Sequence, residues 1–215
     1  CTMQFDTSRL IFVISAPRSG STLLQRVLGS HSDIFTHPEP HLLTPLYYLG
    51  YYETLATAPF DAVNSGAALR EFVGRLPNQE TDYLDALRAY CNTLYTRMLS
   101  TTKKYYFVDK TPAYATVLPF LPKLYPQARY IILTRHPAAI LHSQAQAFFN
   151  GDYHTAAQQN PLFPAYSQAI GNLLRDRDAY TLSHIRYEDL VRNPAQSIER
   201  TLQELNMPYE PSMIH

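Results

Sequence analysis

The stretch Leu10-Ile-Phe-Val-Ile-Ser-Ala-Pro-Arg-Ser-Gly-Ser-Thr22 decides the fold. Its first five residues are all apolar, which is typical of a strand that is buried on both faces of a parallel sheet. A short polar loop follows the strand, and Ser21 begins a segment with helical periodicity. A strand, a tight loop and a helix in this order place a row of backbone N–H groups where they can bind an anion.

Three more apolar segments predict strands, and each ends in a polar or charged residue. They cover residues 105–109, 129–134 and 181–186. The intervening stretches predict helices at residues 21–30, 65–76, 81–100, 116–125, 138–149, 163–180 and 194–206. Because strands that alternate with helices define an α/β fold, we expect a central parallel sheet flanked by helices.

The middle of the chain interrupts this alternation. The segment between Thr36 and Thr102 contains no clear strand, and from about residue 40 to residue 102 it is expected to form a mainly helical insertion. A chain of 215 residues suffices for one sizeable core, so residues 1–215 are expected to form a single domain. The insertion can then line or cap a site on that domain.

Composition excludes several classes of protein. Eighteen Lys and Arg balance eighteen Asp and Glu, so no basic field is available to attract nucleic acid or an anionic membrane. Cys1 and Cys91 cannot build a disulfide framework and lack the spacing of a zinc site. No apolar run is long enough to span a bilayer, and the first run lacks the flanks of a signal peptide. We expect a cytoplasmic protein, with a lumenal catalytic domain separated from its anchor as the alternative.

The first loop resembles a phosphate-binding loop that has lost its lysine. Against the nucleotide-binding pattern G-x-x-x-x-G-K-[ST], Gly20 and Thr22 are in register, whereas Ser15 replaces the first glycine and Ser21 replaces the lysine. The sheet is therefore expected to be P-loop-like. Without the lysine a nucleoside triphosphate lacks its usual cation, and Arg18 can supply positive charge from a different angle.

A second anion-binding signal follows the strand at residues 129–134. Arg135 stands at the strand end, Pro137 is placed to begin a helix, and Ser143 lies eight residues after the arginine. The arginine and the hydroxyl can converge on one anion, because about 9 Å of helical rise separates them and an arginine side chain is long. Alone, this pair is equally compatible with a surface arginine and an ordinary helix serine.

Together, the loop Pro17-Arg-Ser-Gly-Ser-Thr22 and the segment Arg135-His-Pro-Ala-Ala-Ile-Leu-His-Ser143 resemble the two cofactor motifs of sulfotransferases that use 3′-phosphoadenosine 5′-phosphosulfate (PAPS). The similarity continues through Asp109-Lys-Thr-Pro112 and Arg186-Tyr-Glu-Asp-Leu190 and so spans most of the chain. It is greatest to the bacterial and protein-tyrosine branches of the family, since the cytosolic branch usually carries a lysine in the first loop.

The resemblance implies roles for individual residues. Those expected to hold the 5′-phosphosulfate are Arg18, Ser19, Gly20, Ser21 and Thr22. Arg135 and Ser143 are expected to hold the 3′-phosphate, Tyr187 to approach the cofactor, and Lys110 to steady the leaving group. The product is adenosine 3′,5′-bisphosphate (PAP), and no metal is expected. The family also closes the nucleotide with a later basic, glycine-containing loop, and no such segment occurs within these 215 residues.

The segment Thr36-His-Pro-Glu-Pro-His41 supplies candidates for the catalytic base. Glu39 matches the glutamate that serves as base in the tyrosine-sulfating relatives, so the resemblance favours it. His37 and His41 are alternatives because histidine titrates near neutral pH. A residue beyond His215 is a further alternative. The expected reaction is an in-line displacement that transfers the sulfuryl group to a hydroxyl or an amine.

Two other functions remain open at this stage. A P-loop kinase requires a loop lysine and a magnesium-binding acid, and Ser21 argues against it. A catalytically silent nucleotide-binding module would bind PAP without turnover. The acceptor can be a small molecule, a glycan, a lipid or a peptide, because the insertion that would build the acceptor pocket carries no diagnostic pattern. The sequence does not specify an oligomeric state.

Overall fold

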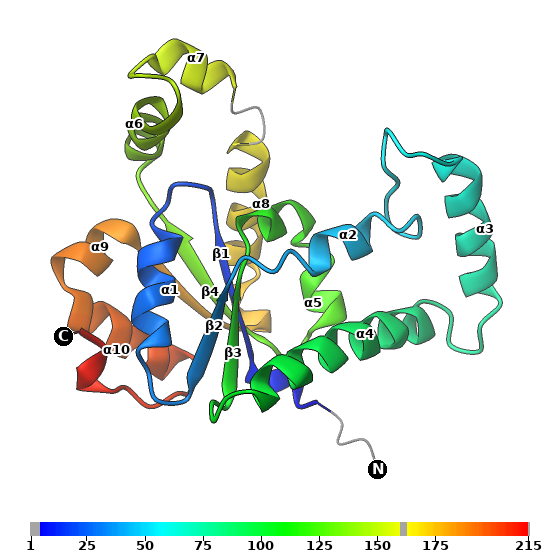
Figure 1. Ribbon diagram of the computed structural model, residues 1–215, viewed down its shortest axis with the longest axis horizontal. Helices are drawn as coiled ribbons and strands as arrows, with labels where there is room; N and C mark the ends of the chain where they lie inside the picture. The colour runs from blue at the N-terminus through cyan, green and yellow to red at the C-terminus, as the bar shows by residue number, and fades with distance from the viewer. Residues whose placement is uncertain (1–4, 160–162, 215) are drawn as a thin grey trace.

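The computed structural model describes residues 5–159 and 163–214. Over these residues the centre of the protein is a five-stranded parallel sheet with the strand order β2-β3-β1-β4-β5 (Figure 1). The strands are β1 (Leu10–Ser15), β2 (Ile34–Pro38), β3 (Tyr106–Lys110), β4 (Arg129–Thr134) and β5 (Thr181–Arg186). The first strand is central, so its following loop emerges in the middle of the carboxyl edge of the sheet.

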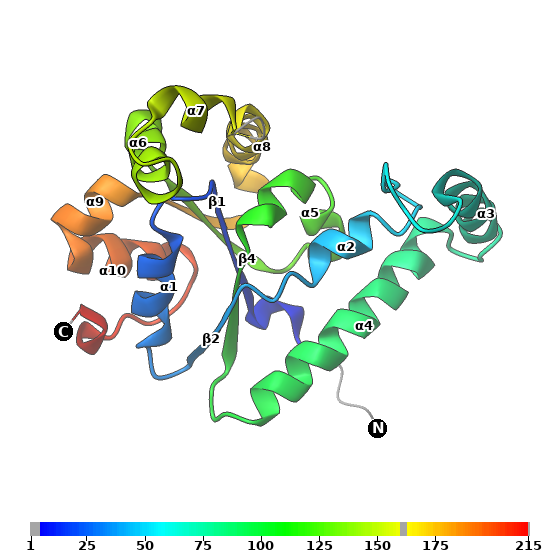
Figure 2. The same cartoon turned by 45° about the horizontal axis from the view of Figure 1, so that its top comes forward.

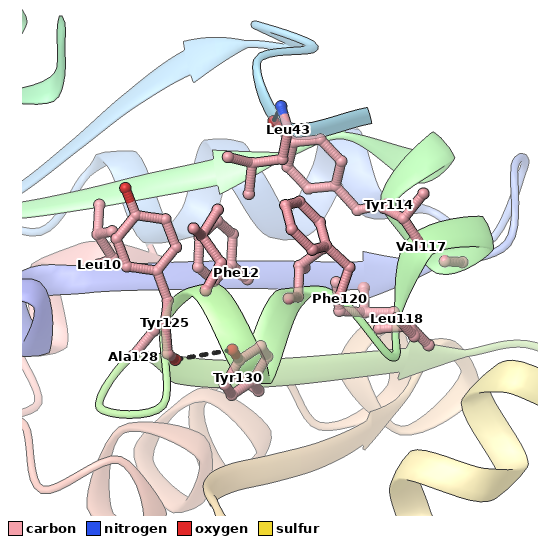
Figure 3. Packing of buried hydrophobic residues seen from close by; sticks show 14 of the residues in the cluster. Leu10, Phe12, Leu43, Tyr114, Val117, Leu118, Phe120, Tyr125, Ala128 and Tyr130 are labelled. Atoms are coloured by element: carbon pink, nitrogen blue, oxygen red, sulfur yellow. Dashed lines mark hydrogen bonds between the residues drawn. The ribbon is translucent and has the colours of Figure 1, made fainter. Parts of the chain in front are cut away.

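Helices cover both faces of the sheet, as the sequence predicts (Figures 1 and 2). One face carries α1 (Ser21–Gly29), α9 (Tyr187–Arg192) and α10 (Pro194–Glu204), and the other carries α4 (Glu80–Ser100), α5 (Leu121–Leu124) and α8 (Phe163–Arg175). Successive residues of β1 point to opposite faces. Ile11 and Val13 accordingly join one buried cluster, whereas Leu10, Phe12 and Ile14 join the other, part of which Figure 3 shows.

One strand was not predicted. β2 includes Thr36, His37 and Pro38, which the sequence analysis places in a segment without a strand, and that prediction is wrong. The strand lies at the edge of the sheet and pairs only with β3, and of its five residues only Ile34 is buried. A half-exposed edge strand that ends in proline lacks the apolar run by which the central strands are recognised. Because Pro38 pairs with Lys110, the residue after β2 lies beside the end of β3.

The insertion is helical, and within residues 40–102 the structure contains α2 (Leu43–Tyr47), α3 (Ala62–Gly74) and α4 but no strand. In both views α3 stands away from the sheet (Figures 1 and 2). The predicted helix at 116–125 is instead a 3-10 helix, η2 (Pro112–Val117), followed by the single turn of α5. Pro119 and Pro122 lie in this segment, and a continuous helix across it would lose two backbone hydrogen bonds because proline lacks an N–H.

The remaining elements lie at the ends of the sheet or beside it. Helices α6 (Pro137–Phe148) and α7 (Tyr153–Gln158) lie above the carboxyl ends of the strands (Figure 1). Short 3-10 helices are η1 (Thr7–Arg9), η3 (Arg177–Ala179) and η4 (Pro211–Ile214). Among the helices formed by the described residues, none combines the length and the apolar character needed to cross a membrane.

Candidate functional site

A cavity of about 440 Å³ opens at the carboxyl edge of the sheet. Ligands of open parallel sheets bind at this edge, because the loops that follow the strands meet there. Four such connections contribute to the cavity. Its lining residues are Pro17, Arg18, Gly20, Ser21, Thr22, Glu39, His41, Pro112, Ala113, Arg135 and Ser143.

The loop between β1 and α1 forms one wall of the cavity. Arg18 and Gly20 both adopt left-handed backbone conformations, with φ of 67° and 93°. At Gly20 a Cβ atom would lie 2.3 Å from the ring of Tyr187, so only glycine fits there. Ser19 is 1% exposed, and its Oγ atom has no hydrogen-bond partner among the described residues. The loop therefore carries an unused buried donor together with the first N–H groups of α1.

Arg18 joins this loop to the second anion-binding segment. Its Nε atom donates a hydrogen bond to Ser143 Oγ on α6 over 3.1 Å. The guanidinium of Arg135 donates to the carbonyl oxygen of Arg18 over 3.0 Å. The structure thus brings Arg18, Arg135 and Ser143 together, although 125 residues separate Arg18 from Ser143. Two arginines that share a wall with several hydroxyls form a local site for anions on a chain without net charge.

Tyr187 lies between the two anion-binding segments. The guanidinium carbon of Arg135 is 4.3 Å from the centre of the Tyr187 ring. The same ring also packs against Gly20. Arg135 Nε is buried without a partner among the described residues, so this arginine retains an unused donor. Tyr187 packs against both Gly20 and Arg135 and is not among the residues that line the cavity.

Glu39, which lines the cavity, forms an ion pair with Lys110. Lys110 Nζ donates to Glu39 Oε1 over 2.6 Å; Lys110 is the last residue of β3, and Glu39 directly follows the adjacent strand β2. Lys110 is 3% exposed, whereas the Glu39 side chain is 41% exposed and lines the cavity. His41 Nε2 lies 3.6 Å from the other oxygen of Glu39. A carboxylate held by a buried ammonium therefore faces the same cavity as the arginines.

His37 is placed differently from the other two candidates for the base. Its Nδ1 atom lies 2.7 Å from the carbonyl oxygen of Pro38, and it is not among the residues that line the cavity. Its own carbonyl oxygen accepts a hydrogen bond from Gln25 Nε2 over 2.9 Å. The structure therefore brings Glu39 and His41 to the site, while His37 bonds to the backbone.

Asp109 lies directly before Lys110 but does not face the cavity. It is fully buried, and its oxygens accept hydrogen bonds from the hydroxyls of Tyr95, Thr111 and Tyr114 over 2.7, 3.0 and 2.9 Å. Burial raises the pKa of this carboxyl to about 6, and the three hydrogen bonds act in the opposite direction. With its oxygens engaged by three hydroxyls, Asp109 is not placed to bind a magnesium ion in the cavity.

Three residues with contacts to the site were not assigned a site role from the sequence. The buried Gln25 fixes the end of β2 from α1, and a polar residue on the apolar stripe of that helix is the signal that could have revealed it. Glu188 Oε1 accepts a hydrogen bond from the backbone N–H of His136 over 2.8 Å and so fixes the turn after Arg135. The exposed ring of Phe148 lies 5.6 Å from the Arg18 guanidinium carbon, and no sequence pattern marks this contact.

The arrangement combines three chemical properties. Arg18 and Arg135 supply positive charge, hydroxyl and backbone groups supply hydrogen-bond donors, and Glu39 supplies an exposed proton acceptor. Among the residues that the structure describes, no group of three or more His, Cys, Asp or Glu side chains could hold a metal ion. Such a cavity can bind a polyanionic ligand beside a carboxylate that accepts a proton.

Comparison with known proteins identifies the class to which this fold and cavity belong. A model of the sulfotransferase family matches residues 10–211, which is nearly the whole chain. The protein therefore belongs to the sulfotransferase family, as its motifs predict. The P-loop-like parallel sheet is the fold of the solved sulfotransferases that it resembles.

Two relatives illustrate the similarity in sequence. Nodulation protein NoeE from Sinorhizobium fredii is 30% identical over 95% of this chain and 51% of its own length. A putative protein-tyrosine sulfotransferase from Caenorhabditis briggsae is 25% identical over 99% of this chain and 71% of its own. This chain thus spans about half the length of the first relative and a larger share of the second.

Two solved structures illustrate the similarity in fold. The sulfotransferase domain of the curacin biosynthetic pathway matches with a TM-score of 0.61 and 27% identity, over 94% of this chain and 75% of that one. Mouse sulfotransferase SULT7A1 complexed with PAP matches with a TM-score of 0.52, over 95% of this chain and 61% of that one. At 14% identity the mouse enzyme shows the shared fold alone.

Proposed function

We propose that this protein transfers a sulfuryl group from PAPS to a hydroxyl or amine acceptor. The observation that carries the proposal is the convergence of Arg18, Arg135 and Ser143 on one cavity that also exposes Glu39. The two arginines and Ser143 can bind a sulfuryl donor that carries several negative charges. The carboxylate of Glu39 can take up the proton that the acceptor hydroxyl or amine releases. Membership in the sulfotransferase family supports the same reaction.

The cavity fits the chemistry of PAPS. Ser19 Oγ and Arg135 Nε are buried without a partner among the described residues, so both can donate to an anionic ligand. In our proposal the loop from Arg18 to Thr22 holds the 5′-phosphosulfate, including the hydroxyls of Ser19, Ser21 and Thr22. Arg135 and Ser143 hold the 3′-phosphate. PAPS supplies the activated sulfuryl group, and PAP is the product.

Glu39 and Lys110 carry the proposed proton and charge chemistry. Glu39 would accept the proton of the acceptor hydroxyl as its oxygen bonds to sulfur, while the bond between sulfur and the bridging 5′-phosphate oxygen breaks and PAP leaves with that oxygen. Lys110 orients this carboxylate through its 2.6 Å hydrogen bond. Its ammonium also supplies positive charge beside the leaving group, as the family resemblance implies. Arg18, in the same cavity, adds charge stabilisation.

The two alternative functions have less support. A kinase would need a cation in place of Ser21 and a free acid near the phosphates, and Asp109 is engaged by three hydroxyls. A catalytically silent module would bind PAP without transferring sulfate, so a turnover assay distinguishes it from an enzyme.

The acceptor is not specified and can be a small molecule, a glycan, a lipid or a peptide. We take a phenol as the first probe because one relative is named for protein-tyrosine. A cytoplasmic location, or a lumenal one as the alternative, remains a prediction from sequence.

Calorimetric binding of PAP tests the donor assignment. We expect PAP to bind without magnesium and to bind more tightly than 5′-AMP, because Arg135 and Ser143 recognise its second phosphate. ADP, and ATP with magnesium, serve as comparisons on the same protein. A preference for ATP with magnesium would reverse the assignment in favour of a kinase.

Glu39→Gln tests the base. The amide keeps the size of the side chain and an oxygen that accepts from Lys110, but it cannot take up a proton. We expect turnover to fall on the order of 100-fold while PAP affinity changes less than about twofold. Glu53→Gln is the control, because Glu53 lies in the insertion and outside the cavity lining. Retained activity in Glu39→Gln and its loss in His41→Gln would assign the base to the histidine.

A further inference from the structure

Glu39 and His41 belong to a short segment that is attached to the rest of the protein at both ends. At one end Lys110 Nζ bonds to Glu39 Oε1. At the other end the backbone N–H of Leu43 donates to the hydroxyl oxygen of Tyr114 over 3.3 Å. Leu43 is the first residue of α2, so its N–H has no partner within the helix, and the preceding N-cap residue Leu42 provides no side-chain cap.

The second attachment leads back to the strand that carries the first. Tyr114 donates its hydroxyl proton to Asp109 Oδ2 over 2.9 Å, and Asp109 directly precedes Lys110. Tyr114 and Leu43 are fully buried and lie side by side in the core (Figure 3). The contacts therefore form a closed ring through Asp109, Lys110, Glu39, Leu43 and Tyr114.

The hydrogen bonds of this ring have a defined direction. An ionised carboxylate only accepts, so the hydroxyl of Tyr114 donates to Asp109 and its lone pair receives the N–H of Leu43. Burial raises the pKa of Tyr114 well above its usual value, which keeps the hydroxyl protonated. Loss of this one hydroxyl would leave the Leu43 N–H buried and unpaired, and it would release one end of the segment that carries Glu39.

We infer that Tyr114 is a positioning residue that holds the Glu39–His41 segment at the cavity by anchoring the end of the segment that Lys110 does not hold. This inference rests on the proposed function for its catalytic consequence, whereas its structural part stands on the contacts alone. Tyr114 does not line the cavity and acts through the backbone of Leu43. An effect on the reaction would arise from the placement of Glu39, because small displacements of a reacting group slow catalysis.

Tyr114→Phe and Tyr95→Phe form a matched pair that tests the inference. Both tyrosines are buried and donate to the same oxygen of Asp109, but only Tyr114 also accepts from Leu43. Amide hydrogen exchange is measured over residues 39–47 in both variants, with PAP at saturation and without it. Turnover is measured with PAPS and N-acetyltyrosinamide, and thermal unfolding reports the general loss of stability.

We expect Tyr114→Phe to accelerate exchange at Leu43 and to lower turnover on the order of tenfold, with PAP affinity within about twofold of the parent. Tyr95→Phe should lower the unfolding temperature without either effect. Equal exchange at residues 39–47 in the two variants would overturn the inference. Failure of the parent protein to bind PAP would overturn the proposed function instead, and the exchange comparison would still decide the role of Tyr114.

Discussion

Arg18→Ala is expected to reduce sulfuryl transfer on the order of 100- to 1000-fold and to weaken PAP binding. Arg18 is the only cation of the first loop, and its side chain reaches Ser143 on α6 over 3.1 Å. Alanine keeps the cost of the left-handed backbone at this position, where φ is 67°, because both residues carry a Cβ. The substitution therefore removes the guanidinium without relaxing the loop, and any loss of turnover reports on the charge and its hydrogen bond.

Two companion variants sharpen this experiment. Arg26→Ala removes an exposed arginine from α1 that does not line the cavity, so turnover should stay at the parent level. Arg18→Lys keeps the charge but loses the planar group whose Nε bonds to Ser143, and it should retain part of the activity. Near-normal turnover in Arg18→Ala would remove Arg18 from the mechanism and leave Arg135 as the arginine that acts on the donor.

The sequence predicted the central strands because they are buried on both faces. β1, β3 and β4 carry consecutive apolar residues, and the structure places their ends within one or two residues of the prediction. β2 was missed for the opposite physical reason. Its residues Phe35, Thr36 and His37 are only partly buried, and its single strand neighbour is β3, so tertiary pairing rather than pattern decides its conformation.

The features of the site also divide into those that the sequence predicts and those that depend on tertiary contacts. Arg18 and Gly20 could be found from the sequence because strand, loop and helix are continuous there, and local geometry fixes the loop. The contact of Arg18 with Ser143, the packing of Tyr187 between Gly20 and Arg135, and the anchoring of Leu43 by Tyr114 join distant segments. Such contacts depend on the register of parallel strands and on side-chain volume, which no local spacing encodes. The resemblance to the family identified several of these residues, but it did not predict which of them are in contact.

Arg135→Ala is expected to reduce the preference of the protein for PAP over 5′-AMP by roughly 2 to 5 kcal/mol, the range for removing one partner of a charge pair that is buried once the ligand is bound. Its guanidinium is held by the ring of Tyr187 and by the carbonyl of Arg18, while Nε has no partner among the described residues. That free, buried donor is what a phosphate would use. The ratio of the two dissociation constants, measured by calorimetry, isolates this contribution.

The ratio is the appropriate quantity because Arg135 has a second task. Its hydrogen bond to Arg18 also supports the first loop, so the substitution should weaken binding of both nucleotides to some extent. A loosened loop affects PAP and 5′-AMP alike and leaves their ratio unchanged, whereas loss of a phosphate contact affects PAP alone. Glu188→Gln provides the control, because its amide oxygen can still accept a hydrogen bond from the N–H of His136 and preserve the turn after Arg135. The ratio should therefore stay at the parent value in this variant. An unchanged ratio in Arg135→Ala would place the 3′-phosphate at other residues and assign Arg135 to the support of the loop.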